Sequence, residues 1–111
     1  SKTLILLYPI PELGVYPLEL YLNKFLNIEE SLSYDRRYWD DYAYEINSYF
    51  DNKELINLEK IDSDEIFCNN FIYDKCTASL DGTMFYWDDD HLSYDGVSYI
   101  ADKILKIIKN T

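Results

Sequence analysis

The chain has 111 residues, of which 48% are hydrophobic and 17% aromatic, and this length supports one domain with a core. Its formal net charge of −11 at pH 7 argues against nucleic acid or an anionic membrane surface as a partner, because both attract clustered Lys and Arg. The sequence also contains no run of about 18 apolar residues that could span a bilayer.

A strand is the first element that the sequence predicts. Residues 3–8 (TLILLY) form a continuous apolar run closed by Pro9, which is typical of a parallel strand buried on both faces. A turn-rich loop, PIPELGVYP, follows, and Pro17 suits the first turn of a short helix. The apolar residues of this helix recur at helical spacing: Leu18, Tyr21, Leu22, Phe25 and Leu26.

A longer amphipathic helix is predicted from Ser33 to about residue 50, with Ser33 or Asp35 as its cap. Its apolar stripe, which we expect to face the core, consists of Tyr38, Trp39, Tyr42, Ala43, Ile46, Tyr49 and Phe50. Residues 55–61 (LINLEKI) are the second predicted strand. Strand, helix and strand in this order form a βαβ unit with parallel strands.

Residues 62–86 are less regular, with a turn signal at Asp81-Gly82 and a short extended piece at residues 83–86. A final helix is predicted after Ser93, a good N-cap. Its apolar stripe is Val97, Ile100, Ala101, Ile104, Leu105 and Ile108. The predicted class is α/β, but one βαβ unit and a terminal helix cannot bury a strand on both faces. We therefore expect part of a larger sheet.

The segment WDDDHLS contains His91, the only histidine of the chain, directly after three aspartates. Three interpretations are open: acids that offset the dipole of the following helix, a metal site, or a catalytic dyad. In a dyad the acid must reach Nδ1 of the imidazole. Asp90 adjoins the histidine and is expected to point away, whereas Asp88, three residues back, can curl under the ring. The spacing therefore favours Asp88 as the partner of His91.

Cys68 and Cys76 are the only cysteines. No second pair of cysteines or histidines accompanies them, which disfavours a structural zinc site. Spacing alone leaves two possibilities, a disulfide in an oxidising compartment or two reduced thiols.

The stretch YWDDDHLSYDGVSYIADKIL (residues 86–105) resembles the C-terminal catalytic block of SGNH (GDSL-type) hydrolases and acyltransferases, whose pattern is Asp-x-x-His. It is most similar to the SGNH domain fused to integral-membrane acyltransferases (acyltransferase 3 family) that O-acetylate bacterial surface polysaccharides. In that block an aromatic residue and an acidic run precede His-Leu-Ser and a glycine, and Ser93 and Gly96 match. PIPELG and the cysteine pair also resemble this family.

The resemblance implies that residues 1–111 are the C-terminal part of a single SGNH-like domain with a flavodoxin-like, three-layer α/β/α fold and a parallel sheet. His91 and Asp88 would be catalytic, Cys68 and Cys76 would form a disulfide, and no metal or organic cofactor would be required. The serine nucleophile and the Gly and Asn of the oxyanion hole would lie outside the chain, because no Gly-Asp-Ser block is present.

The function implied is that of part of a polysaccharide O-acetyltransferase, inactive as a fragment. The acyl donor would come from a membrane acyltransferase domain, and the acceptor would be a glycan. The location would be the periplasmic or extracellular face, attached to an integral-membrane parent. Self-association through the incomplete sheet is a further expectation. The alternatives are an SGNH esterase or deacetylase and a non-catalytic, acidic glycan-binding module.

Overall fold

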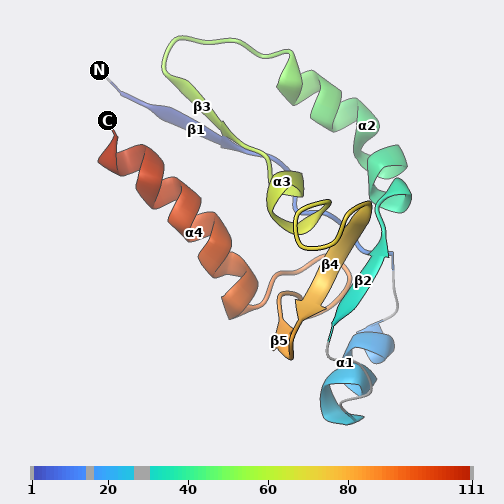
Figure 1. Ribbon diagram of the computed structural model, residues 1–111. Helices are drawn as coiled ribbons and strands as arrows, with labels where there is room; N and C mark the ends of the chain where they lie inside the picture. Colours follow the sequence, from blue (N-terminus) through green and yellow to red (C-terminus); the bar gives the residue numbers. More distant parts are fainter. Residues whose placement is uncertain (1, 15–16, 27–30, 111) are drawn as a thin grey trace.

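The computed structural model describes residues 2–14, 17–26 and 31–110, which form a mixed α/β structure (Figure 1). The α/β class is therefore confirmed. Within these ranges no helix has the length and apolar character needed to cross a membrane. The elements in chain order are β1 (Leu4–Leu7), α1 (Pro17–Leu26), β2 (Leu32–Asp35), α2 (Arg37–Asp51), β3 (Leu58–Ile61), α3 (Asp64–Phe67), β4 (Lys75–Leu80), β5 (Thr83–Met84) and α4 (Tyr94–Lys109).

The two predicted strands pair in parallel, as expected. β1 and β3 are in register from Leu4 opposite Leu58 to Leu7 opposite Ile61. β3 is shorter than the predicted 55–61, since its first paired residue is Leu58. Because the strands are parallel, the loops that follow them, residues 9–14 and 62–63, leave the same edge of the sheet. In α/β folds, ligand sites lie at this carboxyl edge.

The prediction that the first strand is buried on both faces is wrong for this structure. Leu4 is 59% exposed and Leu7 is 41% exposed, while the two residues between them are partly buried. The physical reason is that, in the described part of the chain, β1 pairs with β3 alone. Among the residues that the structure describes, no second strand covers its other edge.

A three-stranded antiparallel sheet, β2-β4-β5, was not anticipated. Its central strand buries polar residues, and hydrogen bonds satisfy them: the hydroxyls of Ser33 and Thr77 lie 2.9 Å apart, and the Leu32 amide donates to Ser79 Oγ over 3.0 Å. Ser33 therefore lies in β2 and does not cap a helix. The turn predicted at Asp81 and the following glycine does connect β4 to β5, and both residues have positive φ, as a type I′ hairpin turn requires.

The long helices bury less of their apolar stripes than predicted. α2 and α4 lie on either side of the β1–β3 pair (Figure 1), yet in α2 only Trp39 and Ala43 are buried, and in α4 only Gly96 and Ile100. Several large residues of both stripes remain exposed: Tyr38, Tyr42, Ile46, Tyr49, Val97, Leu105 and Ile108. Each long helix therefore contributes only a small part of its predicted stripe to the core.

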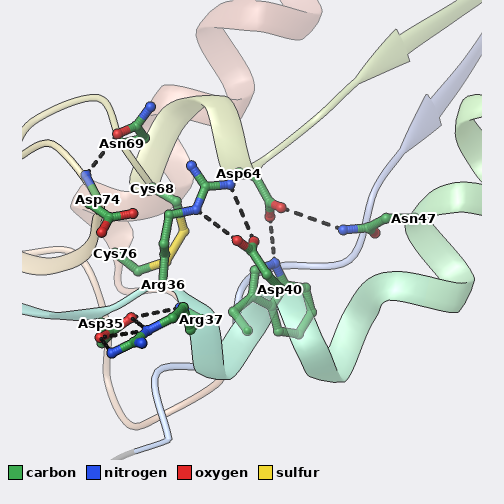
Figure 2. A network of polar contacts seen from close by, with 11 residues as sticks. Asp35, Arg36, Arg37, Asp40, Asn47, Asp64, Cys68, Asn69, Asp74 and Cys76 are labelled. Atoms are coloured by element: carbon green, nitrogen blue, oxygen red, sulfur yellow. Dashed lines mark hydrogen bonds and ion pairs between the residues drawn. A yellow bond between two sulfur atoms is a disulfide. The ribbon is translucent and has the colours of Figure 1, made fainter.

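A disulfide joins Cys68, at the end of α3, to Cys76 of β4, with an S–S distance of 2.04 Å (Figure 2). Close to it, Asp64 accepts a hydrogen bond of 2.6 Å from the indole Nε1 of the buried Trp39. Burial raises the pKa of this carboxyl to about 6, despite the indole bond. Figure 2 also shows Arg36 forming a fork with Asp40, next to these groups. This network fixes α3 against α2 and β4.

Candidate functional site

The turn that contains His91 is closed at its base by backbone hydrogen bonds. The Trp87 amide donates to the His91 carbonyl over 2.7 Å, and Ser93 N donates to the Phe85 carbonyl over 2.8 Å. Ser93 then caps α4 as predicted, because its hydroxyl accepts a hydrogen bond from the Gly96 amide. These hydrogen bonds therefore fix the histidine turn to the N-terminus of α4.

Gly96 allows α4 to approach the strand end before the turn. A Cβ at this position would lie 2.2 Å from the Phe85 carbonyl oxygen, far inside van der Waals contact. The glycine that follows His-Leu-Ser in this motif is therefore required by packing. It lets the helix begin directly beside the backbone that anchors the turn.

The loop that follows β1, residues 9–14, packs on the same turn. Its carbonyls accept hydrogen bonds from two buried hydroxyls, Ser63 to Pro9 over 2.6 Å and Tyr86 to Pro11 over 2.8 Å. The Leu13 amide donates to the Asp89 carbonyl over 2.8 Å. The carboxyl edge of the parallel sheet and the histidine turn therefore form one surface.

His91 and Asp88 are in contact through the Nδ1 side of the ring. Nδ1 lies 3.1 Å from Oδ1 and 3.0 Å from Oδ2 of Asp88 in hydrogen-bond geometry. Asp88 Oδ1 also accepts the backbone amides of Asp90 and His91, over 3.0 and 2.8 Å. These bonds hold the carboxylate under the ring. The imidazole side chain is 72% exposed.

Asp90 differs from the expectation that it points away from the ring. Its Oδ1 lies 2.7 Å from His91 Nδ1, so two carboxylates face the same nitrogen. The Asp88 contacts have hydrogen-bond geometry, whereas the Asp90 contact is an ion pair once the imidazole is protonated. The backbone conformation of the closed turn brings the adjacent side chain back onto the ring, which spacing alone did not predict.

The electrostatics of the turn follow from these contacts. The hydrogen bond to Asp88, followed by the charges of Asp88 and Asp90, raises the pKa of His91. Partial burial raises the pKa of Asp88, but the two backbone amides and the imidazole outweigh it, so this pKa lies below its usual value. Partial burial and the neighbouring Asp88 carboxyl raise the pKa of Asp90. Glu12, half-buried in the 9–14 loop, has its pKa raised by burial and then by Asp90 and Asp89.

The side chains of this turn could also bind a cation. Asp88, Asp90 and His91 offer donor atoms that all lie within 4.8 Å of one another. All three come from one exposed turn, and within the described ranges no donor from another element joins them. Two of the candidate ligands, Asp88 and His91, are also hydrogen-bonded to each other, and Asp88 accepts two backbone amides as well. The arrangement is better suited to orienting an imidazole.

Two serines near the candidate site, Ser63 and Ser93, have structural roles. Ser63 is fully buried and donates to the Pro9 carbonyl. Ser93 is 7% exposed, donates to the Met84 carbonyl over 2.6 Å and caps α4. Both hydroxyls are engaged in these hydrogen bonds, so neither is placed to serve as a nucleophile activated by His91.

Sequence reasoning missed three contributors to this surface: Asp90, Tyr86 and the 9–14 loop with Glu12. The loop carried a usable signal, because a proline-rich segment directly after an apolar parallel strand lies at the carboxyl edge of the sheet. Tyr86 carried none, since its hydroxyl bonds to a residue 75 positions earlier in the chain.

The Asp88–His91 contact lies next to a capped helix and to the loop that leaves the carboxyl edge of the parallel sheet, and its geometry is that of an acid orienting an imidazole. A family model for the SGNH domain (fused to AT3 domains) matches residues 1–106, and the chain belongs to this family. Comparison with the curated proteins and with the solved structures gives no match. The family relationship is therefore that of an acyltransferase-associated module.

Proposed function

We propose that this chain supplies the histidine and the aspartate of a Ser-His-Asp triad in an O-acetyltransferase that acts on a bacterial surface polysaccharide. The observation that carries the proposal is the contact of both Asp88 oxygens with Nδ1 of His91, at 3.1 and 3.0 Å. An acid bound at Nδ1 leaves Nε2 as the proton acceptor. The family, SGNH domains fused to AT3 domains, points to acyl transfer as the chemistry.

In the proposed reaction His91 acts first as a base and then as an acid. Nε2 takes the proton of the serine hydroxyl as its oxygen attacks the acyl carbonyl, and the imidazolium gives that proton to the departing donor group. A glycan hydroxyl then attacks the acyl-serine, again losing its proton to Nε2, and the serine oxygen regains a proton. Asp88 maintains the Nδ1–H tautomer and stabilises the imidazolium in both halves.

The proposal places the nucleophilic serine and the oxyanion hole elsewhere in the complete protein. It is supported by the structural roles of Ser63 and Ser93. The acyl donor would pass from a membrane acyltransferase domain, and the reaction would take place on the periplasmic or extracellular face.

The open edge of β1 supports a larger, flavodoxin-like sheet. The amides of Leu4 and Tyr8 donate toward β3, so by alternation those of Ile5 and Leu7 point to the other edge. Beside this strand lies an apolar pocket of about 260 Å³. Its lining residues are Leu4, Ile5, Leu6, Tyr49, Phe50, Lys53, Leu55 and Leu58. We propose that a further strand of the same domain covers this edge. If a second copy covers it instead, sedimentation of this chain will show a dimer.

The catalytic proposal is tested in the complete protein with His91→Ala, Asp88→Asn and, as a matched control, Asp89→Asn. His91→Ala should abolish transfer of the acyl group to the glycan. Asp88→Asn should reduce kcat by several orders of magnitude, as in other triads, while Asp89→Asn costs little. Full activity of His91→Ala would refute the proposal. Release of the acyl group to water with no acylated glycan would favour the esterase alternative.

A further inference from the structure

Two carboxylates approach the same ring nitrogen of the single histidine of the chain. Both Asp88 oxygens meet Nδ1 in hydrogen-bond geometry, at 3.1 and 3.0 Å. Asp90 Oδ1 is closer, at 2.7 Å, and forms an ion pair with the ring when the imidazole is protonated. A carboxylate that accepts a hydrogen bond from Nδ1–H is the stronger determinant of which ring nitrogen carries the proton, whereas a close carboxylate paired with the ring by charge acts mainly by stabilising the imidazolium.

We propose that Asp90 is a positioning residue that stabilises the charged imidazolium of His91, while the hydrogen bonds of Asp88 are sufficient to set the tautomer. The part of this inference that concerns catalysis rests on the proposed function. The contact between Asp90 and His91 does not depend on it, because it is observed in the folded turn. In catalysis, each proton transfer to Nε2 creates a cation whose Nδ1 side faces two carboxylates.

The surroundings of Asp90 fit a role that depends on its charge. The Asp88 and Asp89 carboxyls adjoin it, and Glu12 of the 9–14 loop is a fourth acidic group that interacts with the turn. The Asp90 amide is occupied by Asp88 Oδ1, which fixes the backbone that directs the Asp90 side chain. Asp89 lies between the two partners in sequence but makes no ion pair with the ring. It is therefore a matched control of equal charge.

The ionisation of His91 can be measured without overlap from other residues of its type, because His91 is the only histidine of the chain. With ¹⁵N-labelled histidine, the two ring nitrogens report the pKa and the neutral tautomer separately as the pH is varied. We expect a wild-type pKa above 6.5 and a neutral ring with the proton on Nδ1. Asp90→Asn should lower the pKa by about half a unit to one unit, as a close but exposed charge would, and leave the tautomer unchanged.

The variants separate the two roles. Asp88→Asn should lower the pKa and also lose the preference for Nδ1–H. Asp89→Asn should have less than about a third of the effect of Asp90→Asn. Asp90→Glu should restore at least half of the lost shift. In the complete enzyme, Asp90→Asn should move the limb of the pH–rate profile that reports the base to lower pH.

Three results would overturn the inference: an unchanged pKa in Asp90→Asn, an equal shift in Asp89→Asn, or a change of tautomer in Asp90→Asn. A wild-type pKa at or below 6.5 would also overturn it. None of these measurements requires a serine or an acyl donor. If the NMR results hold but acyl transfer is unaffected by His91→Ala, the proposed function fails by itself.

Discussion

Replacement of Gly96 by alanine sets two opposing effects against each other in the first turn of α4. Alanine favours a helix over glycine by about 1 kcal/mol. The added Cβ, however, would lie 2.2 Å from the Phe85 carbonyl oxygen and 3.1 Å from a Leu92 methyl group. The first obstacle is backbone, so the helix start must move by roughly 1 Å to reach an ordinary contact.

Overpacking of this kind typically costs about 1–3 kcal/mol, and a backbone obstacle belongs at the upper end of that range. After the propensity gain, we expect Gly96→Ala to lower the free energy of unfolding by about 2 kcal/mol. In a domain of this size that loss lowers Tm by roughly 10 °C. Because the helix start carries Ser93, the hydrogen bond of its hydroxyl to the Gly96 amide should weaken as well.

Urea unfolding at constant pH measures the effect, with Ala101→Gly as a control at an exposed position of the same helix. The control isolates helix propensity and should cost about 1 kcal/mol. If Gly96→Ala stabilised the chain by a similar amount, propensity alone would govern the position. The packing argument for this glycine would then be wrong.

Three further predictions concern the core. The raised pKa of Asp64 means that the folded chain holds a proton that the unfolded chain loses above pH 3.8, so the contribution of this carboxyl to stability is greatest below that pH and falls as pH rises through about 6. Asp64→Asn should therefore stabilise by about 1–2 kcal/mol at pH 7.5, allowing for partial solvent screening, and much less at pH 4; equal effects at both pH values in urea unfolding would contradict this. Reduction of the Cys68–Cys76 disulfide, which closes a short loop, should cost about 2–3 kcal/mol, and an unchanged urea midpoint after addition of reductant would refute it. Tyr86→Phe should cost about 1–2 kcal/mol by removing the donor to the Pro11 carbonyl, and a thermal melt identical to wild type would exclude that bond as a contributor.

The parts of the fold that the sequence predicted are those governed by local pattern. The apolar run of β1 and the Ser93 cap were each readable from a few neighbouring residues. β4 was not, because its buried face includes Thr77 and Ser79, whose hydrogen bonds come from residues more than 40 positions away. A strand that buries hydroxyls shows no hydrophobic alternation, and only the partner strand explains it.

The candidate site divides in the same way. The contact of Asp88 with His91 follows from a three-residue spacing at a helix start, and spacing predicted it. The approach of Asp90 to the same nitrogen depends on how the turn closes, through the bond between the Trp87 amide and the His91 carbonyl. The bond of Leu13 to the turn depends on tertiary packing. Neither leaves a local pattern in the chain.

The three hydrogen bonds that hold the 9–14 loop have a consequence for how the chain folds. They join Pro9 to Ser63, Pro11 to Tyr86, and Leu13 to Asp89, each across more than 50 residues of sequence. Closing such long loops is slow and entropically costly, so these contacts form late and together. Hydrogen exchange at the Leu13 amide should then report global rather than local opening. In a partly folded chain, even one with α4 and its cap formed, the histidine turn would therefore lack its contact with the 9–14 loop.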